Sequence, residues 1–465
     1  MKVTIIFILI NLIIFTGTAQ QVAIINYEDY ILAVVLNHPI AKQADLVELM
    51  GDAELQTARG AFDPKFSSNY NQKYFEEKDY FSVWDNKLII HTLGGLTINA
   101  GYKKNDGQFL DPSFSTPENG LWNAGLGLAI GKGLITDERR TALKQAKIYK
   151  DATRQEKLKL LNDLIFDASS AYINWAISRE KLRLATEIRA LADLRFKNTL
   201  STAEQGDAAA IDTLEAFAIL QNRVQLEQEA LMETLLSQNH VEQFLWSGAT
   251  EPVSINPEAQ PDSLTADKFK TIFDSLLITE SSLISGHPDF ILSEFKINQL
   301  ELERRLAKEA LKPDIQLSFN PLVGSTTQTL FDTYNTNNYL IGAQFTYPLL
   351  LRKERGKAKM IQYKIESSQF KQITLQRKIG FKLQQLRIKE DLLNGQLDLS
   401  RDNMAFSSIL VDAENRKYQI GESSLFLINS RESKLIENQQ KYLSLLKKLI
   451  ESRLEYLYTS ASLSQ

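Results

Sequence analysis

The sequence predicts a mainly α-helical fold that also contains β-strands, built as a duplicated helix–strand–strand–helix unit. Two segments 249 residues apart share one layout: Pro64 follows His38-Pro39 by 25 residues, and Pro313 follows His287-Pro288 by 25 residues. In each segment the first Pro suits the first turn of a helix, and the second Pro ends that helix and opens an alternating run. A second alternating run and a very long helical pattern follow in both halves.

The composition limits the class of protein. The chain has 465 residues, of which 43% are hydrophobic and 24% charged, with a net charge of −4. These values exclude a disordered chain, and the lack of a basic segment argues against binding to nucleic acid. Cysteine is absent, so disulfides, thiolate metal sites and a lipid-modified N-terminal Cys are excluded.

Residues 1–19 have the pattern of a cleaved signal peptide. Lys2 supplies the positive charge, residues 5–15 are apolar apart from Asn11, and small residues at 17–19 precede a cleavage site before Gln20. No later stretch approaches about 18 uninterrupted apolar residues, so we expect an exported mature chain without a transmembrane helix.

Helical periodicity predicts two very long helices, over 137–201 and 352–418. Shorter helices are predicted over 27–36, 39–61, 207–246, 266–278, 288–311 and 422–458. The helices over 39–61 and 207–246 together match the first long helix in length. Those over 288–311 and 422–458 likewise match the second, so in each half two short helices stacked end to end would equal one long helix of about 100 Å.

Both long helices carry a coiled-coil seam with a mean spacing near 3.5 residues. The seam comprises Leu158, Leu161, Ile165, Ala168, Tyr172, Trp175 and Leu182 in the first helix, and Ile379, Leu383, Leu386, Leu393, Leu397 and Met404 in the second. An ordinary antiparallel bundle would show the same periodicity. The helix lengths favour a tube or a rod, because a compact domain seldom needs helices of this length.

Alternating segments at about 65–76, 121–131, 314–323 and 338–348 resemble outer-membrane strands, with apolar residues on one face and small or polar residues on the other. The residues expected to face lipid are Trp122, Leu126, Leu128, Ile130, Ile341, Phe345 and Tyr347. A half-buried soluble sheet is the alternative. A further candidate strand near 96–102 would either extend beyond the bilayer or pair with an unidentified segment. Four strands cannot close a conducting barrel, so closure requires other copies.

The repeat, the Pro-bounded helix–strand segments and an Arg-aromatic-x-x-Gly helix-tip motif resemble the TolC-type outer-membrane efflux and secretion channel family. The resemblance covers nearly all of the mature chain. It implies a homotrimer in which each protomer adds four strands to a 12-stranded outer-membrane barrel and its helices form a periplasmic tunnel. It places the first repeat at 20–246, an equatorial linker at 247–265 and the second repeat at 266–465.

The implied function is the exit channel of a tripartite efflux or type I secretion system in a Gram-negative bacterium. Such a channel passively conducts substrates from an inner-membrane pump and a periplasmic adaptor across the periplasm and outer membrane. It needs no cofactor. An exported coiled-coil scaffold without transport activity is the alternative, although a scaffold would not need the alternating strands. The sequence does not indicate the substrate, the pump, the adaptor or the ion selectivity.

The helix tips are the expected gate and adaptor contacts, formed by Arg195, Phe196, Gly206, Asp207, Asp212, Arg416, Lys417, Tyr418 and Gly421. The second tip fits the family motif, with Gly421 able to end its helix in a left-handed conformation. The first tip carries six inserted residues within 197–205, which we expect to lengthen it. Asp207 and Asp212 form either part of a cation-selecting ring or an N-terminal helix-charge pair.

No catalytic or metal-binding pattern is present. The four histidines, at 38, 91, 240 and 287, have no metal-ligand partner four residues later, and the chain lacks a serine elbow and a phosphate loop. We therefore expect that the protein is not an enzyme.

Overall fold

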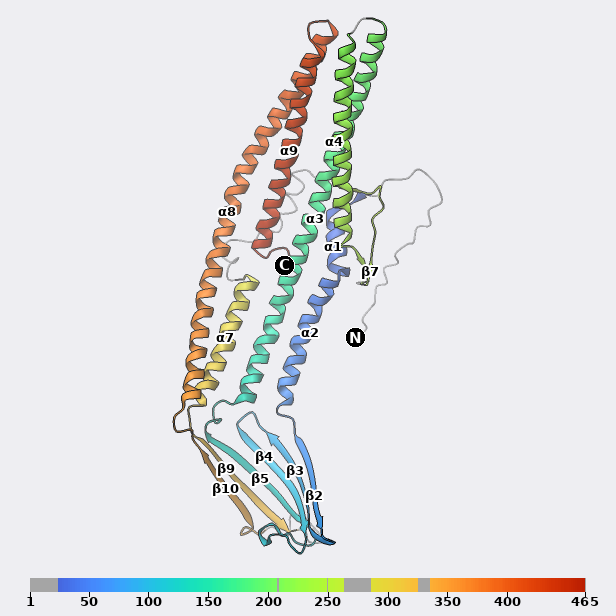
Figure 1. Ribbon diagram of the computed structural model, residues 1–465. Coiled ribbons are helices and arrows are strands. Elements are labelled where there is room, and N and C mark those ends of the chain that lie inside the picture. Colours follow the sequence, from blue (N-terminus) through green and yellow to red (C-terminus); the bar gives the residue numbers. More distant parts are fainter. Residues whose placement is uncertain (1–23, 207–208, 249, 263–285, 325–334, 465) are drawn as a thin grey trace, which may run out of the picture. The chain divides into compact units, whose positions relative to one another are not determined.

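The computed structural model describes residues 24–206, 209–248, 250–262, 286–324 and 335–464, which fall into two compact units (Figure 1). Unit 1 takes Met1–Pro39, Leu164–Ser275 and Ile388–Glu455, and unit 2 takes Ile40–Asp163, Leu276–Arg387 and Tyr456–Gln465. Each unit therefore draws on both sequence repeats. The predicted signal peptide, the helix expected over 266–278, Asp207 and parts of the linker lie outside the described residues.

The helices lie where the periodicity placed them, with shifts of a few residues at their ends. Their bounds are α1 (Tyr27–Asn37), α2 (Pro39–Gly60), α3 (Glu138–Glu204), α4 (Ala210–Glu242), α7 (Pro288–Glu309), α8 (Arg352–Gln419) and α9 (Leu425–Thr459). A short 3-10 helix covers Pro112–Phe114. The predicted insertion at the first tip continues α3 as a helix up to Glu204.

Within unit 2 the helices lie side by side in the order α2, α3, α7, α8 (Figure 1). Leu55 and Ala58 of α2 pack on Ala146 of α3, and Leu300 and Ala307 of α7 pack on α8. Polar contacts join α3 to α7, where Gln145 donates to the Gln299 carbonyl at 3.4 Å. The apolar residues are thus buried between neighbouring helices.

Within unit 1 the helices lie in a similar order, α4, α3, α9, α8. Tyr172 and Trp175 of α3 are among the largest buried side chains and have no exposed surface. Tyr27 of α1 contacts Tyr172 edge to face at 5.5 Å and forms a hydrogen bond with Ser169 at 2.8 Å. Burial raises the pKa of Tyr27 to about 12. The helix α1 is therefore held on α3 by a core of aromatic rings.

Two pairs of short strands accompany the helices of unit 1. The strand β1 (Ile24–Ile25) pairs in parallel with β8 (Gln260–Pro261), and β6 (Trp246–Ser247) pairs with β7 (Glu251–Pro252). The Tyr172 hydroxyl donates to the Ile25 carbonyl at 2.7 Å, which ties β1 to α3.

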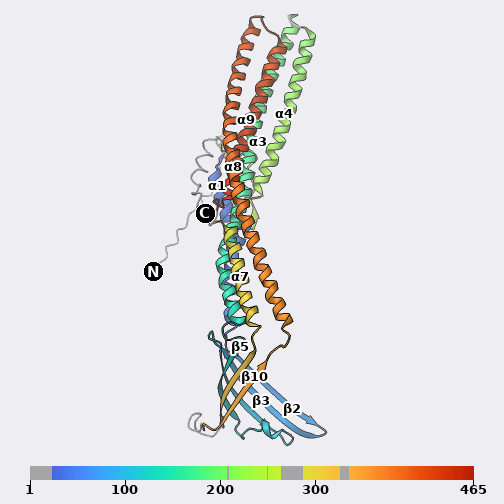
Figure 2. The same ribbon diagram turned by 90° about the vertical axis from the view of Figure 1, so that its left-hand side faces the viewer.

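Unit 2 also contains a six-stranded antiparallel sheet in the order β10–β9–β5–β4–β3–β2 (Figures 1 and 2). Its strands are β2 (Lys65–Phe75), β3 (Lys78–His91), β4 (Leu96–Asp106), β5 (Leu121–Gly131), β9 (Asp314–Gly324) and β10 (Tyr339–Thr346). The hairpin β3–β4 lies between the two strands that the sequence predicted for the first repeat.

The prediction of four strands per chain is therefore wrong, because the sheet has six. The candidate strand near 96–102 is part of β4, and its unidentified partners are β3 and β5. Two features hid β3. Its alternation is interrupted by the run Asp85-Asn86-Lys87, and the β2–β3 turn uses Glu76 and Glu77 at φ of 51° and 58° instead of the Asn-Gly pair that signals such turns.

Candidate functional site

One face of the sheet is apolar across at least five strands. The register pairs Ile90 of β3 with Ile98 of β4, and continues through Leu126, Phe319 and Ile341 of the next three strands. A parallel row joins Leu96, Leu128, Leu317 and Ala343. Leu126 is 49% exposed and Ile341 is 69% exposed. A contiguous exposed surface of large apolar side chains is typical of a face that contacts lipid or another protein. Removing these side chains from water on such contact lowers the free energy.

Aromatic residues extend along this apolar face. Tyr102 lies 4.8 Å from Trp122 and 6.0 Å from Trp84, as measured between ring centroids. Tyr70 of β2 is the register partner of Trp84, and Phe319 lies 5.8 Å from Tyr339. The Trp84 indole also donates to the Ser68 hydroxyl at 3.1 Å. Aromatic side chains with one polar end are typical of the interface between lipid and water.

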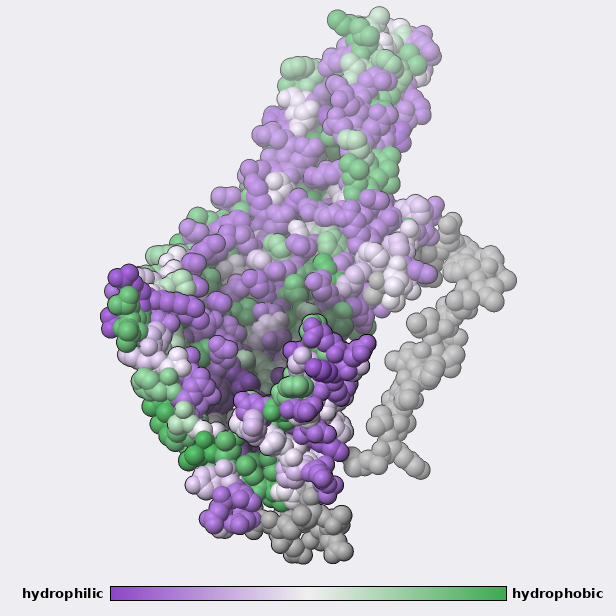
Figure 3. All heavy atoms as spheres, turned by 60° about the horizontal axis from the view of Figure 1, so that its bottom comes forward, coloured by the Kyte–Doolittle hydropathy of each residue, from purple (hydrophilic) through white to green (hydrophobic). Residues whose placement is uncertain are grey.

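The opposite face of the sheet is polar and lines a hollow (Figure 3). The row next to the apolar one contains His91, Thr97, Gly127, Ser318 and Gly342. These residues line a cavity of about 1020 Å³, together with Asn99, Gln316, Gln344 and charged residues from the nearby helix ends. Apolar residues, among them Phe62, Ile89 and Leu306, also border this cavity. The small, polar and charged side chains of the sheet row suit a water-filled space.

The glycines of β5 differ in the space around them. A Cβ on Gly127 would meet its nearest atom, in Thr97, at 3.6 Å, which is an ordinary contact. A Cβ on Gly125 would lie 2.4 Å from the Phe319 carbonyl oxygen, so only glycine fits at that position. Gly127 therefore tolerates a small polar side chain, whereas Gly125 is required by the close approach of β9.

The two helix tips of unit 1 end on glycines in the left-handed conformation. Gly206 has φ of 87° after α3, and Gly421 has φ of 79° after α8. At the second tip the Glu422 amide donates to the Lys417 carbonyl at 2.9 Å, which satisfies one of the last carbonyls of α8. The Ser423 hydroxyl contacts Glu414 at 2.7 Å, and this hydrogen bond lowers the pKa of the Glu414 carboxyl.

Near the first tip, Arg195 joins the two repeats. Its guanidinium makes two contacts with the Glu432 carboxylate, at 2.5 and 2.6 Å, and these side chains are only 18% and 14% exposed. Arg195 also donates to Asn429 at 3.4 Å, and the Asn429 amide donates to Glu215 at 3.3 Å. The network links α3, α9 and α4. A bidentate pair of this kind fixes the relative orientation of the two side chains as well as the distance between them.

The other predicted tip residues do not form one cluster within a single chain. Arg416, Lys417 and Tyr418 are exposed, and the Arg416 Nε donates to the Asp412 carbonyl one turn earlier in α8. Asp212 lies in the first turn of α4, and Phe196 contacts Phe217 at 5.4 Å. In the described part of the chain, no hydrogen bond or ion pair joins Asp212 to Arg416 or Tyr418. Their expected proximity therefore requires another copy and stays a prediction.

The repeat-related histidines have different environments. His287 caps α7, because its Nδ1 accepts the Asp289 amide at 3.1 Å, so its proton is on Nε2 in the neutral form. His38 instead stacks on Phe244 at 5.9 Å. Burial lowers the pKa of both imidazoles. Both are thus neutral structural residues near pH 7.

The chain matches no family model and no curated protein sequence. Solved outer-membrane proteins do match its structure. The CmeC outer membrane channel of Campylobacter jejuni is 12% identical with a TM-score of 0.67, over 94% of this chain and 85% of that one. The outer membrane protein VceC of Vibrio cholerae is 12% identical with a TM-score of 0.67, over 93% of this chain and 95% of that one. The MtrE outer membrane channel of Neisseria gonorrhoeae, in its open state, is 14% identical with a TM-score of 0.65, over 94% of this chain and 88% of that one.

The chain has the TolC-type fold. At these identities the similarity establishes the fold and leaves function to be argued from the residues. The resemblance drawn from the repeat and the tip motif is confirmed at that level. Sequence reasoning missed the acceptor of Arg195, because Glu432 is separated from it by 237 residues and no local pattern marks it.

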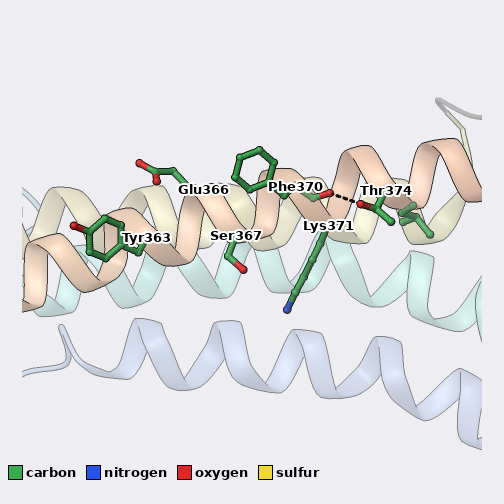
Figure 4. Close-up of a pocket in the computed structure, with 7 residues that line it drawn as sticks. Tyr363, Glu366, Ser367, Phe370, Lys371 and Thr374 are labelled. Atoms are coloured by element: carbon green, nitrogen blue, oxygen red, sulfur yellow. Dashed lines mark hydrogen bonds between the residues drawn. The ribbon is translucent and has the colours of Figure 1, made fainter.

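The described part of the chain can also be compared with the patterns of a metal site, a membrane-spanning helix and a ligand pocket. In the described ranges, no group of three or more His, Asp or Glu residues could hold a metal ion. No described helix is both long enough and apolar enough to cross a membrane. A shallow surface on α8, from Tyr363 to Leu375, has side chains that leave the helix in several directions (Figure 4). They do not converge on a common point.

The Arg195–Glu432 pair predicts that Arg195→Gln destabilises the packing of the tips. Because the pair is bidentate and largely shielded from water, its loss should cost about 1–3 kcal/mol. Thermal unfolding of the purified protein should show a lower midpoint for this variant. The matched control is Arg183→Gln, whose partners Glu180 and Glu187 form exposed pairs on the same helix and whose loss should change the midpoint little. Equal midpoints for the two variants would contradict a stabilising role for Arg195.

Proposed function

We propose that the chain is one subunit of a trimeric outer-membrane exit channel. The observation that carries this proposal is the sheet, which has one exposed apolar face and one polar face lining a hollow. A sheet with this division of faces suits lipid on one side and water on the other. The TolC-type fold and the expected signal peptide support the same location.

In this proposal the sheet crosses the outer membrane and the helices lie in the periplasm. The channel conducts substrates passively from an inner-membrane pump, to which a periplasmic adaptor joins it. The polar lining supports a wet passage and not a specific pocket, so selection of the substrate belongs to the pump. An exported coiled-coil scaffold would have no use for the apolar sheet face.

The proposal predicts a trimer in the outer membrane. Protein expressed with its own N-terminal segment should sediment with outer-membrane markers, and after detergent extraction it should scatter light as three copies. Among the described residues, the two edge strands of the sheet have no second strand partner, so closure requires other copies, and the similarity to TolC-type channels supports three of them. A monomer recovered in the soluble periplasmic fraction would refute the membrane assignment.

A second prediction separates the two faces of the sheet. Leu128→Arg should prevent assembly, because a charge that faces lipid costs about 2–4 kcal/mol in each copy when it lies near the bilayer centre. Gly127→Ser, at the adjacent position of β5, should assemble normally, because its side chain has room and meets water. The yield of trimer in outer membranes is the measurement. Similar yields for the two variants would show that the faces are assigned wrongly.

We also propose that the helix tips form the periplasmic gate. Tyr418 and Arg416 are exposed on a single chain, and Asp212 begins α4 at the other tip. Three copies of Asp212 brought close together would repel one another, so a closed state needs cations or hydrogen-bond donors beside them. Arg416 and Lys417 of a neighbouring copy are the proposed donors.

The gate proposal predicts that Tyr418→Phe combined with Arg416→Ser raises single-channel conductance in planar bilayers. Both substitutions remove donors that would hold the closed tips together. The Arg401→Ser variant, which removes an exposed cation earlier in α8, is the control and should conduct like the parent. Parental conductance in an intact trimer of the double variant would place the constriction elsewhere, with residues 197–205 as the next candidates.

A further inference from the structure

We infer that the β3–β4 hairpin is part of the membrane wall, so that each copy supplies six strands and β2 of one copy pairs with β10 of the next. This inference rests on the proposed trimeric channel and changes its wall from 12 to 18 strands. The interaction surface is the pair of sheet edges, and the partner is a second copy of this chain.

The hairpin has the dimensions of a membrane crossing. The strand β4 has 11 residues, the same number as β2, β5 and β9, and β3 has 14. Eleven residues at about 3.3 Å each, tilted by about 45°, span about 26 Å, which matches the apolar band of an outer-membrane barrel. The β3–β4 turn returns to the helix side of the sheet, where Gly95 lies beside the Arg140 guanidinium at the start of α3.

In the hairpin, apolar and polar residues alternate between the same two faces of the sheet as in the neighbouring strands. Ile98 of β4 stands in register with Leu126, on the apolar face, and Thr97 stands in register with Gly127, on the polar face. Two of its charged residues, Asp85 and Lys103, form an ion pair at 3.7 Å on the polar side, where water can solvate them. Lys104, the register partner of Trp84, lies on the apolar side near the end of β4 that is far from the helices. A hairpin that extended beyond the bilayer would not need to continue an apolar row from Leu126 to Ile90.

The edges of the sheet are complementary. All six strands are antiparallel to their neighbours, so the two edge strands, β2 and β10, run in opposite directions. A copy related by rotation can therefore place its β10 antiparallel to β2, and repetition of that contact closes a ring. Both edges alternate in the same way, with Phe66 and Tyr70 on the apolar side of β2, and Ile341 and Phe345 on that of β10.

The added strands widen the wall. With strands about 4.8 Å apart and tilted by about 45°, a barrel of 12 strands has a backbone diameter of about 26 Å, and one of 18 strands about 39 Å. An 18-stranded wall leaves an aqueous channel. The membrane section of this channel is thus suited to bulkier cargo than four strands per copy would pass.

The first test uses single cysteines, because the natural chain has none. Ile98→Cys and Leu126→Cys are register partners on the apolar face, and Thr97→Cys and Gly127→Cys are partners on the polar face. Each is labelled with a nitroxide and reconstituted in phospholipid vesicles. Spin relaxation by oxygen, which concentrates in lipid, is compared with relaxation by a water-soluble nickel chelate.

The six-strand wall predicts that the label at residue 98 behaves like that at 126, with oxygen dominant, and that the labels at 97 and 127 respond to the chelate. If the chelate dominates at both 97 and 98 while 126 and 127 still differ, the hairpin lies outside the wall. That result overturns this inference and leaves the proposed channel intact. If 126 and 127 do not differ, or the parent is not a membrane trimer, the proposed function itself fails.

The second test addresses the edges. Asn69→Cys on β2 is combined in turn with Leu340→Cys, Gln344→Cys and Thr346→Cys on β10, all on the polar face. Oxidation in native outer membranes should yield a covalent trimer for at least one pair. Asn69→Cys with Asn123→Cys on the interior strand β5 is the control and should yield no cross-linked oligomer. Absence of a trimer with every edge pair would refute the edge contact.

Discussion

Backbone hydrogen bonding is the constraint on which this structure depends. In hydrocarbon, each unpaired N–H or C=O costs several kcal/mol, so a sheet that crosses a membrane must pair both edges of every strand. The six-stranded sheet does so internally for β3, β4, β5 and β9, and leaves one edge each of β2 and β10 open. The side chains of the apolar face also favour contact with an apolar surrounding. If the sheet crosses the outer membrane as proposed, a single copy is incomplete and its open edges require association with other copies.

The helices are held together by narrow apolar seams and by charged contacts. In water, the chain can leave polar groups exposed, so its helices bury only narrow seams and use charged contacts between them. Lys157 of α3, for example, lies between Asp45 and Glu48 of α2, and these carboxylates raise the pKa of its amine. Such exposed pairs add little stability, whereas the shielded Arg195–Glu432 pair fixes how the two repeats meet near the tips.

The two repeats have kept one plan while their details have diverged. Both contain a His-Pro step that begins a helix, yet His287 caps its helix through Nδ1 and His38 packs against aromatic rings. Both contain an Arg-aromatic tip, yet Arg195 is held by Glu432 and Arg416 is exposed. Among the described residues, the extra hairpin β3–β4 lies in the first repeat. The two repeats therefore share an order of elements and differ in the contacts of their tips and sheet halves.

The sequence by itself determined the elements that local periodicity specifies. The long helices α3 and α8, the Pro-bounded α2 and α7, and the strands β2, β5, β9 and β10 follow from spacing that neighbouring residues carry. Gly421 at the end of α8 follows from its motif. Only the tertiary structure decided the rest. The strand β3 has a broken alternation and an atypical turn, so its place depends on pairing with β2 and β4. Glu432 meets Arg195 across 237 residues, because the packing of α9 on α3 brings them together and no local signal encodes that contact.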